Sequence, residues 1–362
     1  MKIFERFGWY VIVGLLLISI GLYIYNQIQW MGMAIIMLFV SLALVLQTSK
    51  VLKGFSFTVL IFAAVIAALF YPNLFLRIGS FELKRLIIPL LMIIMFGMGT
   101  SMSFKDFVGV VKMPKGVLIG LVLQFTVMPF IGFGLAYVSA LPPEIAAGVI
   151  LVGCSPSGLA SNVMAYISGA NLALSLTLTA VATLLAPLVT PFFMKLLADE
   201  LVPIDFIGMF WSIMKIVILP IVLGLLLNHF AKKRLSLLNK VLPLVSMAGI
   251  ALIIVIITAA GRDSLLSIGL ILIVVVMIHN LCGFLLGYFG GRFSGLDVAS
   301  SRTIAFEVGM QNAGLASGIA LEMGKLATMG LASAVFGPWM NISGSSLASF
   351  WKDKKSKETT SV

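Results

Sequence analysis

An acidic residue, Glu307, lies inside an apolar segment of membrane-like composition, FEVGMQNAG at residues 306–314. A carboxylate at bilayer depth costs about 2.5–3.5 kcal/mol on insertion scales, so a chain retains one where a cation binds it or a structural partner neutralises it. The neighbouring glycines favour a broken helix with free backbone carbonyls beside the carboxylate. Carboxylate, amide and carbonyl oxygens suit a hard cation rather than a soft metal. The segment therefore predicts an ion-coupled membrane transporter.

A second interrupted segment, CSPSGLASN at residues 154–162, contains oxygen-bearing side chains of the same kind. A helix broken at residues 156–158 frees backbone groups that only protein or water can satisfy. Ser161 and Asn162 follow this break, and Ser175 and Thr179 share one helical face because they are four residues apart. Taken singly, such hydroxyls more often bond their own helix carbonyl or an adjacent helix.

The two interrupted segments recur at a nearly constant offset along the chain. Asn162 and Asn312 are 150 positions apart, and Pro187 and Pro338 are 151 positions apart. An offset of five membrane spans reverses direction, so the two halves would be inverted repeats. Paired Gly/Pro-interrupted segments in two halves indicate a transporter's binding site near the middle of the membrane.

Composition excludes a soluble globule. The chain is 61% hydrophobic and 10% charged, against about 25% charged in soluble domains. The net charge of +11 lies mostly in short loops and therefore indicates topology rather than nucleic-acid binding. Cys154 and Cys282 provide neither a disulfide framework nor metal-ligand spacing. The absence of a nucleotide-binding loop or a hydrolase motif from the sequence argues against a primary pump and against an enzyme.

The apolar runs predict an all-α polytopic membrane protein with twelve spans. The spans are expected near 8–26, 31–47, 57–75, 85–101, 115–139, 143–167, 171–197, 205–230, 240–260, 264–289, 299–321 and 326–350. Most of the 24 Lys and Arg residues fall in one set of alternate loops, which predicts that both termini are cytoplasmic. No cleavage pattern follows the first span, so it is expected to remain as an anchor. Residues 351–362 are expected to form a short, charged, disordered tail.

Four stretches resemble the bile acid:sodium symporter family. They are GCSPSGLASNVM at 153–164, LLAPLVTP at 184–191, EVGMQN at 307–312 and NISG at 341–344. The resemblance extends over about 55–350 and implies inverted five-helix repeats, about 51–200 and 201–350, that form a core and a panel domain with two crossing discontinuous helices. Residues 1–50 would then be an additional N-terminal two-helix extension.

The resemblance also implies a set of site residues, with two sodium ions as transported cations and a small organic anion as substrate. One sodium ion would be held by Ser161, Asn162, Ser175, Thr179 and Glu307, and the second by Gln124, Glu307, Gln311 and the backbone carbonyls of Val308 and Met310. The substrate would lie where the half-helix N-termini meet, near Leu159, Ala160, Asn312, Ala313 and Asn341. Half-helix N-termini attract anions.

Two departures from the family pattern leave the substrate open. Leu159 stands where family members often have a hydroxyl, and Met340 stands where they often have a histidine. Both changes make the cavity less polar, so short hydroxy or keto acids, sterol conjugates and other organic anions all remain candidates. A bacterial inner membrane is the expected location.

Two further titratable residues lie at membrane depth, and two alternatives to sodium symport stay open. Lys215 either attracts an organic anion or faces an aqueous vestibule. His279 is either a proton relay or, more commonly for an intramembrane histidine, a helix–helix hydrogen bond. One alternative is a proton-coupled transporter of the same fold, in which Glu307 and His279 titrate. The other is a membrane sensor that binds its ligand without moving it.

Overall fold

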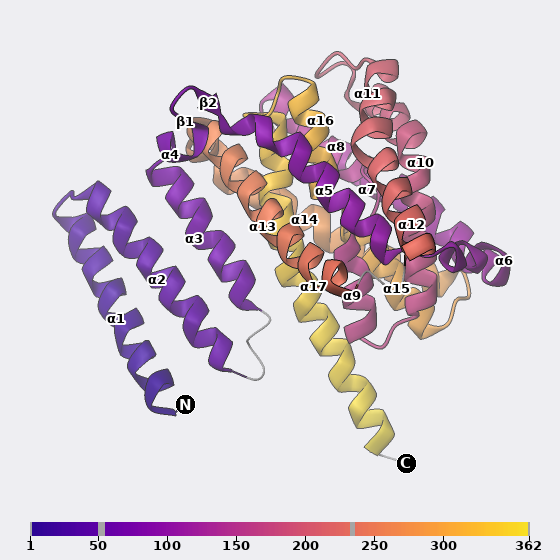
Figure 1. The fold of residues 1–362 in the computed structure, drawn as a ribbon, viewed down its shortest axis with the longest axis horizontal. Helices are drawn as coiled ribbons and strands as arrows, with labels where there is room; N and C mark the ends of the chain where they lie inside the picture. Colours follow the sequence, from indigo (N-terminus) through magenta and orange to yellow (C-terminus); the bar gives the residue numbers. More distant parts are fainter. Residues whose placement is uncertain (1, 50–54, 232–235, 361–362) are drawn as a thin grey trace.

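The chain folds into a bundle of helices with the two ends of the chain at the same end of the bundle (Figure 1). The computed structural model describes residues 2–49, 55–231 and 236–360. Seven of the described helical stretches are long and apolar enough to cross a membrane, and shorter apolar helices accompany them. Such a set of apolar helices satisfies its backbone hydrogen bonds internally, which is the condition for spanning a bilayer.

The first three helices lie side by side at one edge of the molecule (Figure 1). They are α1 (Lys2–Ile24), α2 (Ile28–Thr48) and α3 (Ser56–Phe70). Helix α1 packs on α2, and α2 packs on α3, which contacts the remaining helices. The Tyr71 hydroxyl donates to the carbonyl of Gln29 at 2.5 Å and joins the ends of α2 and α3. Helices α1 and α2 therefore form a helical hairpin at the periphery of the bundle.

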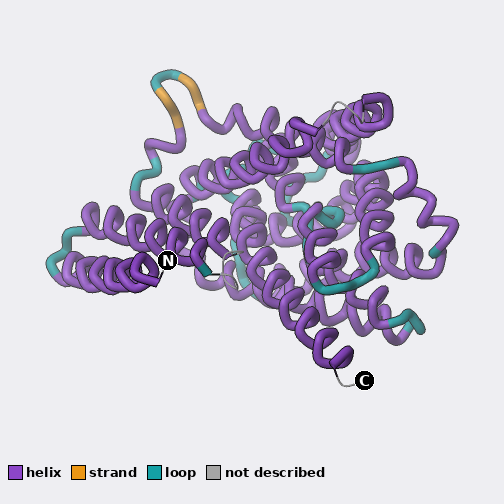
Figure 2. The backbone as a smooth tube through the Cα atoms, turned by 60° about the horizontal axis from the view of Figure 1, so that its bottom comes forward, coloured by secondary structure: helices purple, strands orange, loops and turns teal. Residues whose placement is uncertain are grey.

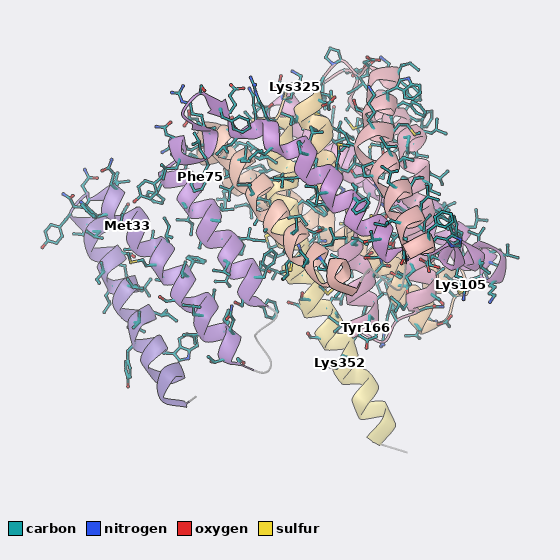
Figure 3. All side chains as sticks on the ribbon, in the orientation of Figure 1. Met33, Phe75, Lys105, Tyr166, Lys325 and Lys352 are labelled. Atoms are coloured by element: carbon teal, nitrogen blue, oxygen red, sulfur yellow. The ribbon has the colours of Figure 1, made fainter. Side chains whose placement is uncertain are left out.

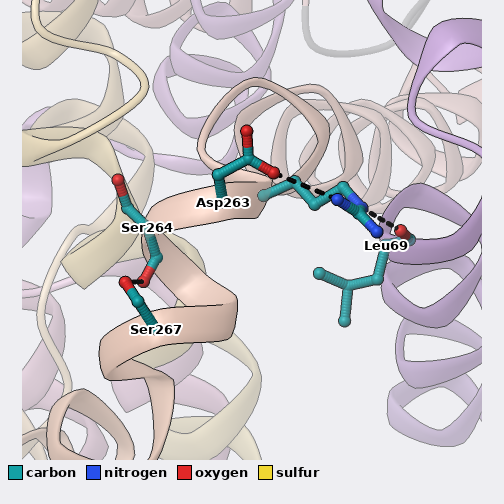
Figure 4. A network of polar contacts seen from close by, with 5 residues as sticks. Leu69, Asp263, Ser264 and Ser267 are labelled. Carbon is teal, nitrogen blue, oxygen red and sulfur yellow. Dashed lines mark hydrogen bonds and ion pairs between the residues drawn. The ribbon is translucent and has the colours of Figure 1, made fainter.

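Polar contacts also attach α3 to the start of α14 (Arg262–Phe293). Arg262 Nε donates to the carbonyl of Leu69 at 2.6 Å, and Arg262 Nη1 lies 3.0 Å from Asp263 Oδ1 (Figure 4). A charged donor to the last carbonyls of a helix satisfies groups that have no partner within that helix.

A small hairpin follows α3 and projects from the bundle (Figure 2). It comprises α4 (Asn73–Leu76), β1 (Arg77–Ile78), β2 (Phe81–Glu82) and the 3₁₀ turn η2 (Leu83–Leu86). The strands pair antiparallel, with Arg77 opposite Glu82. Gly79 in the turn has φ +59°, a backbone conformation that glycine adopts without a steric penalty.

Helix α5 (Ile87–Ser101) packs against a long interrupted helix. That helix comprises α11 (Phe206–Ile213), a π-helical turn at Met214–Ile218 and α12 (Leu219–Ala231). Glycines allow the backbones of α5 and α12 to touch. A Cβ at Gly99 would lie 2.2 Å from the carbonyl oxygen of Ile221, and one at Gly224 would lie 2.3 Å from that of Phe96. Close backbone approach through small residues is how membrane helices pack tightly.

The remaining elements complete the bundle. They are η3 (Phe104–Val108), α6 (Gly109–Lys112), α7 (Pro114–Val138), α8 (Pro143–Cys154), α9 (Leu159–Ile167), α10 (Leu172–Ala198), α13 (Ser236–Ala260), α15 (Val298–Gly309), α16 (Ala313–Glu322) and α17 (Met329–Thr360). The start of α8 is tied to the segment before α17, because the Glu144 carboxylate pairs with Lys325 and accepts the Thr328 hydroxyl at 2.5 Å.

Helices occupy all twelve predicted span ranges, and two of these ranges hold a broken pair, α8–α9 and α15–α16. The prediction of a disordered tail from about 351 is wrong, because α17 continues to Thr360. The segment KDKKSKE at 352–358 contains neither Gly nor Pro and is rich in good helix formers, so the helix extends through it. Several basic loop residues used to predict the topology lie outside the described residues: Lys50, Lys53, Lys232, Lys233 and Arg234.

Candidate functional site

The two broken helices cross at their breaks. Ser157 and Gln311 form an isolated antiparallel bridge. The amide of Gly158 donates to the carbonyl of Met310 at 3.0 Å, and the amide of Asn312 donates to the carbonyl of Pro156 at 2.8 Å. Each break therefore satisfies backbone groups that the other leaves free, which makes non-helical backbone tolerable at membrane depth.

Local sequence explains where each helix stops. Helix α8 ends at Cys154, since a proline two residues later cannot donate to the helix. Helix α15 ends at Gly309 and is followed by extended backbone at Met310. The predicted breaks are therefore present in both segments.

The beginning of α15 is fixed by Asp297, outside the membrane-spanning segments. Asp297 Oδ1 accepts from the amide of Ser300 at 2.9 Å, and Oδ2 accepts from the Ser300 hydroxyl at 2.6 Å. The hydroxyl bond is the main cause that holds the pKa of the Asp297 carboxyl below its usual value, with the backbone amides adding to it and partial burial opposing it. An acceptor at this position satisfies one of the free amides at the helix start.

The Glu307 carboxylate lies at the centre of the crossing, with 1% of its surface exposed. Four hydroxyls lie within hydrogen-bonding distance of it. Oε1 accepts from Ser161 at 2.7 Å and Ser175 at 2.6 Å, and Oε2 accepts from Ser157 at 2.6 Å and Thr179 at 2.9 Å. Two helices, α9 and α10, and one break supply these hydroxyls, so the carboxylate is solvated by protein oxygens in place of water.

Asn162 adds an amide oxygen to this cluster. Its Oδ1 lies 2.8 Å from the Ser175 hydroxyl and 3.4 Å from that of Thr179. The five side chains predicted for the first cation are therefore brought together. A hydroxyl that donates its proton to a carboxylate still carries lone pairs that a cation can use.

Two of the side chains predicted for the second cation, Gln124 and Gln311, also meet. Gln124 Nε2 donates to Gln311 Oε1 at 2.9 Å and to the carbonyl of Ser155 at 3.0 Å, and Gln311 Nε2 donates to the carbonyl of Val308 at 2.6 Å. Gln124 Oε1 is buried and has no hydrogen-bond partner within the described part of the chain. A buried oxygen without a partner is costly, and a cation at this place would satisfy it. The carbonyl of Met310 accepts the crossing bond from Gly158.

A cavity of about 260 Å³ adjoins the first set of ligands. It lies among the end of α5, the start of α9 and α10, and its lining includes Asn162 and Thr179 of the cluster. The other lining residues are Met98, Ser101, Met102, Leu159, Val163, Leu176 and Ala180. The cavity is therefore mainly apolar, with three polar side chains and no charged one in its lining.

The residues predicted to bind substrate lie around the crossing but have different partners. Leu159 lines the cavity. Asn312 caps α16, because its Oδ1 accepts from the amide of Leu315 at 3.0 Å, whereas the N-terminus of α9 has no side-chain cap. Asn341 Nδ2 bonds its own helix at the carbonyl of Gly337. Ala160 and Ala313 are half-buried at the starts of α9 and α16. Their role in substrate binding stays a prediction.

The two isolated titratable residues do not join the cluster. His279 is fully buried, and its Nε2 lies 2.9 Å from the carbonyl of Met128 on α7, which is the helix–helix contact weighed in the sequence analysis. Lys215 is exposed and lies on the π-helical turn.

Ser157 was not among the residues predicted for the site. Its signal was present, because Ser157 and Glu307 are 150 positions apart, the same offset as the two asparagines. Applying the repeat offset to every polar residue of the broken segments would have identified it.

Comparison with known proteins assigns the chain to a family. The profile of the Sodium Bile acid symporter family matches residues 88–280. YocS of Bacillus subtilis, described as an uncharacterized sodium-dependent transporter, is 42% identical over 307 residues, which cover 84% of this chain and 93% of YocS. The chain belongs to the Sodium Bile acid symporter family.

Two other relatives are similar over shorter stretches. The probable sodium/metabolite cotransporter BASS1 of Arabidopsis thaliana chloroplasts is 36% identical over 74% of this chain and 67% of its own length. The human ileal sodium/bile acid cotransporter is 34% identical over 68% of this chain and 71% of its own. This symporter is therefore an integral, multi-pass, all-α membrane protein that couples transport to sodium, and it is not an enzyme.

Proposed function

We propose that this protein couples the inward flow of two sodium ions to the uptake of a small organic anion by alternating access. The observation that carries the proposal is the buried Glu307 carboxylate, which four hydroxyls surround, with a second group of buried oxygens at Gln124, Gln311 and the carbonyl of Val308 in the same crossing. A single negative charge cannot offset a buried pair of divalent cations, so one carboxylate in this crossing suits monovalent cations. All-oxygen ligands suit sodium rather than a soft metal.

The energetics are adequate for accumulation. Each charge that crosses 100 mV contributes about 2.3 kcal/mol, so two sodium ions contribute about 4.6 kcal/mol before any concentration gradient. Moving a monoanion inward against the same potential costs about 2.3 kcal/mol of this free energy. The remainder supports accumulation of roughly fortyfold at about 1.4 kcal/mol per factor of ten, and the sodium gradient adds to it.

The cavity next to the cation ligands favours a small substrate. Its volume of about 260 Å³ is below the about 300–1,000 Å³ of typical drug-sized sites, which disfavours a sterol conjugate. No basic side chain lines it, so the uncapped N-terminus of α9 would supply the attraction for an anion. A compact monocarboxylate with an apolar substituent suits these features best.

The arrangement of charges supports an orientation. Lys105 and Lys352 lie toward the end of the bundle that carries both termini, and Lys325 lies toward the other (Figure 3). By the positive-inside rule, we propose that both termini are cytoplasmic. The similarity to YocS of Bacillus subtilis supports a bacterial membrane. In this proposal residues 1–50 form a peripheral extension, about 51–200 and 201–350 are inverted repeats, and 351–362 are a cytoplasmic tail in which α17 continues to Thr360.

Uptake into liposomes tests this function. Purified protein is reconstituted with potassium inside, and accumulation of labelled two- to six-carbon monocarboxylates is measured with sodium, potassium or a pH gradient outside. Accumulation that requires sodium supports the proposal. Accumulation that follows the pH gradient without sodium would select proton coupling, and binding without accumulation would select a sensor.

A further inference from the structure

We infer that the hydroxyl of Ser157 is a second ligand shared by the two sodium positions, and that it couples their occupancy. The inference rests on the proposed two-sodium function and concerns a residue that the family resemblance does not assign to either ion. Its basis is the symmetry of the crossing, the geometry of the Ser157 side chain and the partners of its neighbours.

The repeat offset of 150 assigns a counterpart to each polar residue at the crossing. Under this offset Ser157 corresponds to Glu307, and Ser161 corresponds to Gln311. The contacts obey the same correspondence. The bridge between Ser157 and Gln311 maps onto a pairing of Glu307 with Ser161, and these two residues are joined by a hydrogen bond of 2.7 Å.

The contact between Ser157 and Glu307 maps onto itself. Its length is 2.6 Å between Ser157 Oγ and Glu307 Oε2. A contact that maps onto itself lies on the pseudo-twofold axis relating the two repeats. The axis also takes Ser161 of the first set to Gln311 of the second, although it does not carry the whole of one set onto the other.

Glu307 belongs to both sets, and the axis carries it to Ser157. Ser157 therefore occupies, in the first repeat, the place that the common carboxylate occupies in the second.

The Ser157 side chain has the free capacity that this role needs. It is 1% exposed, and in the part of the chain that the structure describes its hydroxyl bonds only Glu307. The other three hydroxyls each lie near a second acceptor, the carbonyl of Gly158 or the amide oxygen of Asn162, which competes for their single proton. The Ser157 proton is directed to Glu307 alone, and because donating a proton uses no lone pair, Ser157 Oγ can offer its lone pairs to cations. Its backbone is paired with Gln311 of the second set.

Ser155 provides a matched control for this hydroxyl. It lies two residues away in the same segment and is equally buried, but its Oγ donates to the carbonyl of Leu151 on its own helix at 2.9 Å. Replacing Ser155 by alanine removes a hydroxyl from the same segment without touching Glu307, and it keeps the backbone carbonyl of residue 155 that accepts from Gln124.

The test is a sodium titration of thermal unfolding at constant ionic strength, with potassium as the replacement ion. It compares wild type with Ser157→Ala, Ser157→Gly and Ser155→Ala, and it measures the half-saturating sodium concentration and the steepness of the response. A purely structural role for Ser157 would lower the unfolding temperature in potassium but leave both sodium parameters unchanged.

We expect Ser157→Ala to raise the half-saturating sodium concentration about tenfold, the effect of losing one hydrogen-bonding group to charge, and to reduce the steepness from near two toward one. Ser155→Ala should match wild type in both parameters. The inference about Ser157 would be overturned if both Ser157 variants kept the wild-type sodium parameters, or if they stayed unfolded in saturating sodium. Either outcome would leave the proposed function standing. A wild type that sodium does not stabilise would overturn the proposed function and this inference together.

Discussion

Glu307→Gln removes the buried charge of the site while keeping the size of the side chain. The hydroxyl oxygens lie 2.6–2.9 Å from the carboxylate, so a sodium ion bound by them lies within about 4 Å of the charge. Unit charges at about 4 Å interact by about 4 kcal/mol at an effective dielectric constant of about 20. At about 1.4 kcal/mol per factor of ten, sodium affinity should fall about a thousandfold.

Thermal unfolding in sodium and in potassium measures this loss. At a sodium concentration about 100 times the dissociation constant, wild type gains about 2.7 kcal/mol of stability, whereas the variant should gain about 0.1 kcal/mol or less. Glu322→Gln is the control, because Glu322 lies at the end of α16 and accepts only the Ser212 hydroxyl, at 3.3 Å, among the contacts of the described chain. A Glu307→Gln protein whose half-saturating sodium concentration stays within tenfold of wild type would refute the assignment of the cation site.

Three further experiments test contacts elsewhere in the bundle. Gly224→Leu should prevent the close contact of α12 with α5 and lower the unfolding temperature strongly, because overpacking costs at least about 1–3 kcal/mol. Gly134→Leu is the control, because a side chain at Gly134 meets open space. Equal unfolding temperatures for the two variants would contradict this packing. The pKa of Asp297 is lowered in the folded protein, so its contribution to the free energy of unfolding is present above its unfolded pKa of about 4 and is lost as the pH falls further. Asp297→Asn should therefore flatten the plot of stability against pH in this range. Parallel plots for wild type and variant would argue against this contribution of Asp297. The half-exposed pair of Lys325 and Glu144 should show a coupling of about 1 kcal/mol or less in a double-mutant cycle; a coupling several times larger would show that the pair is effectively buried.

The positions of the helices and their breaks follow from local sequence. Apolar runs long enough to cross a bilayer indicate the spans, because each must satisfy its own backbone hydrogen bonds. Pro156 and Gly309 mark the two breaks, and both helices stop beside them. Glu307 identifies the site because a buried carboxylate needs a compensating partner wherever it lies in the fold.

Other features depend on contacts that local pattern does not reveal. The exposure of Lys215 and the contact of His279 with Met128 depend on which face of each helix meets a neighbour. The extension of α17 to Thr360, by contrast, follows from local sequence. The charged residues that suggest a disordered tail are also good helix formers.

The sequence by itself determined that this chain is an ion-coupled membrane protein with two interrupted helices and a buried carboxylate that needs a compensating partner. Only the tertiary structure decided which oxygens surround that carboxylate. Gln124 and Gln311 meet across 187 positions of sequence, and Ser157 reaches Glu307 across 150. Hydrophobic periodicity and desolvation are properties of one segment, whereas a binding site is a set of distances between segments, and those distances exist only once the two breaks cross.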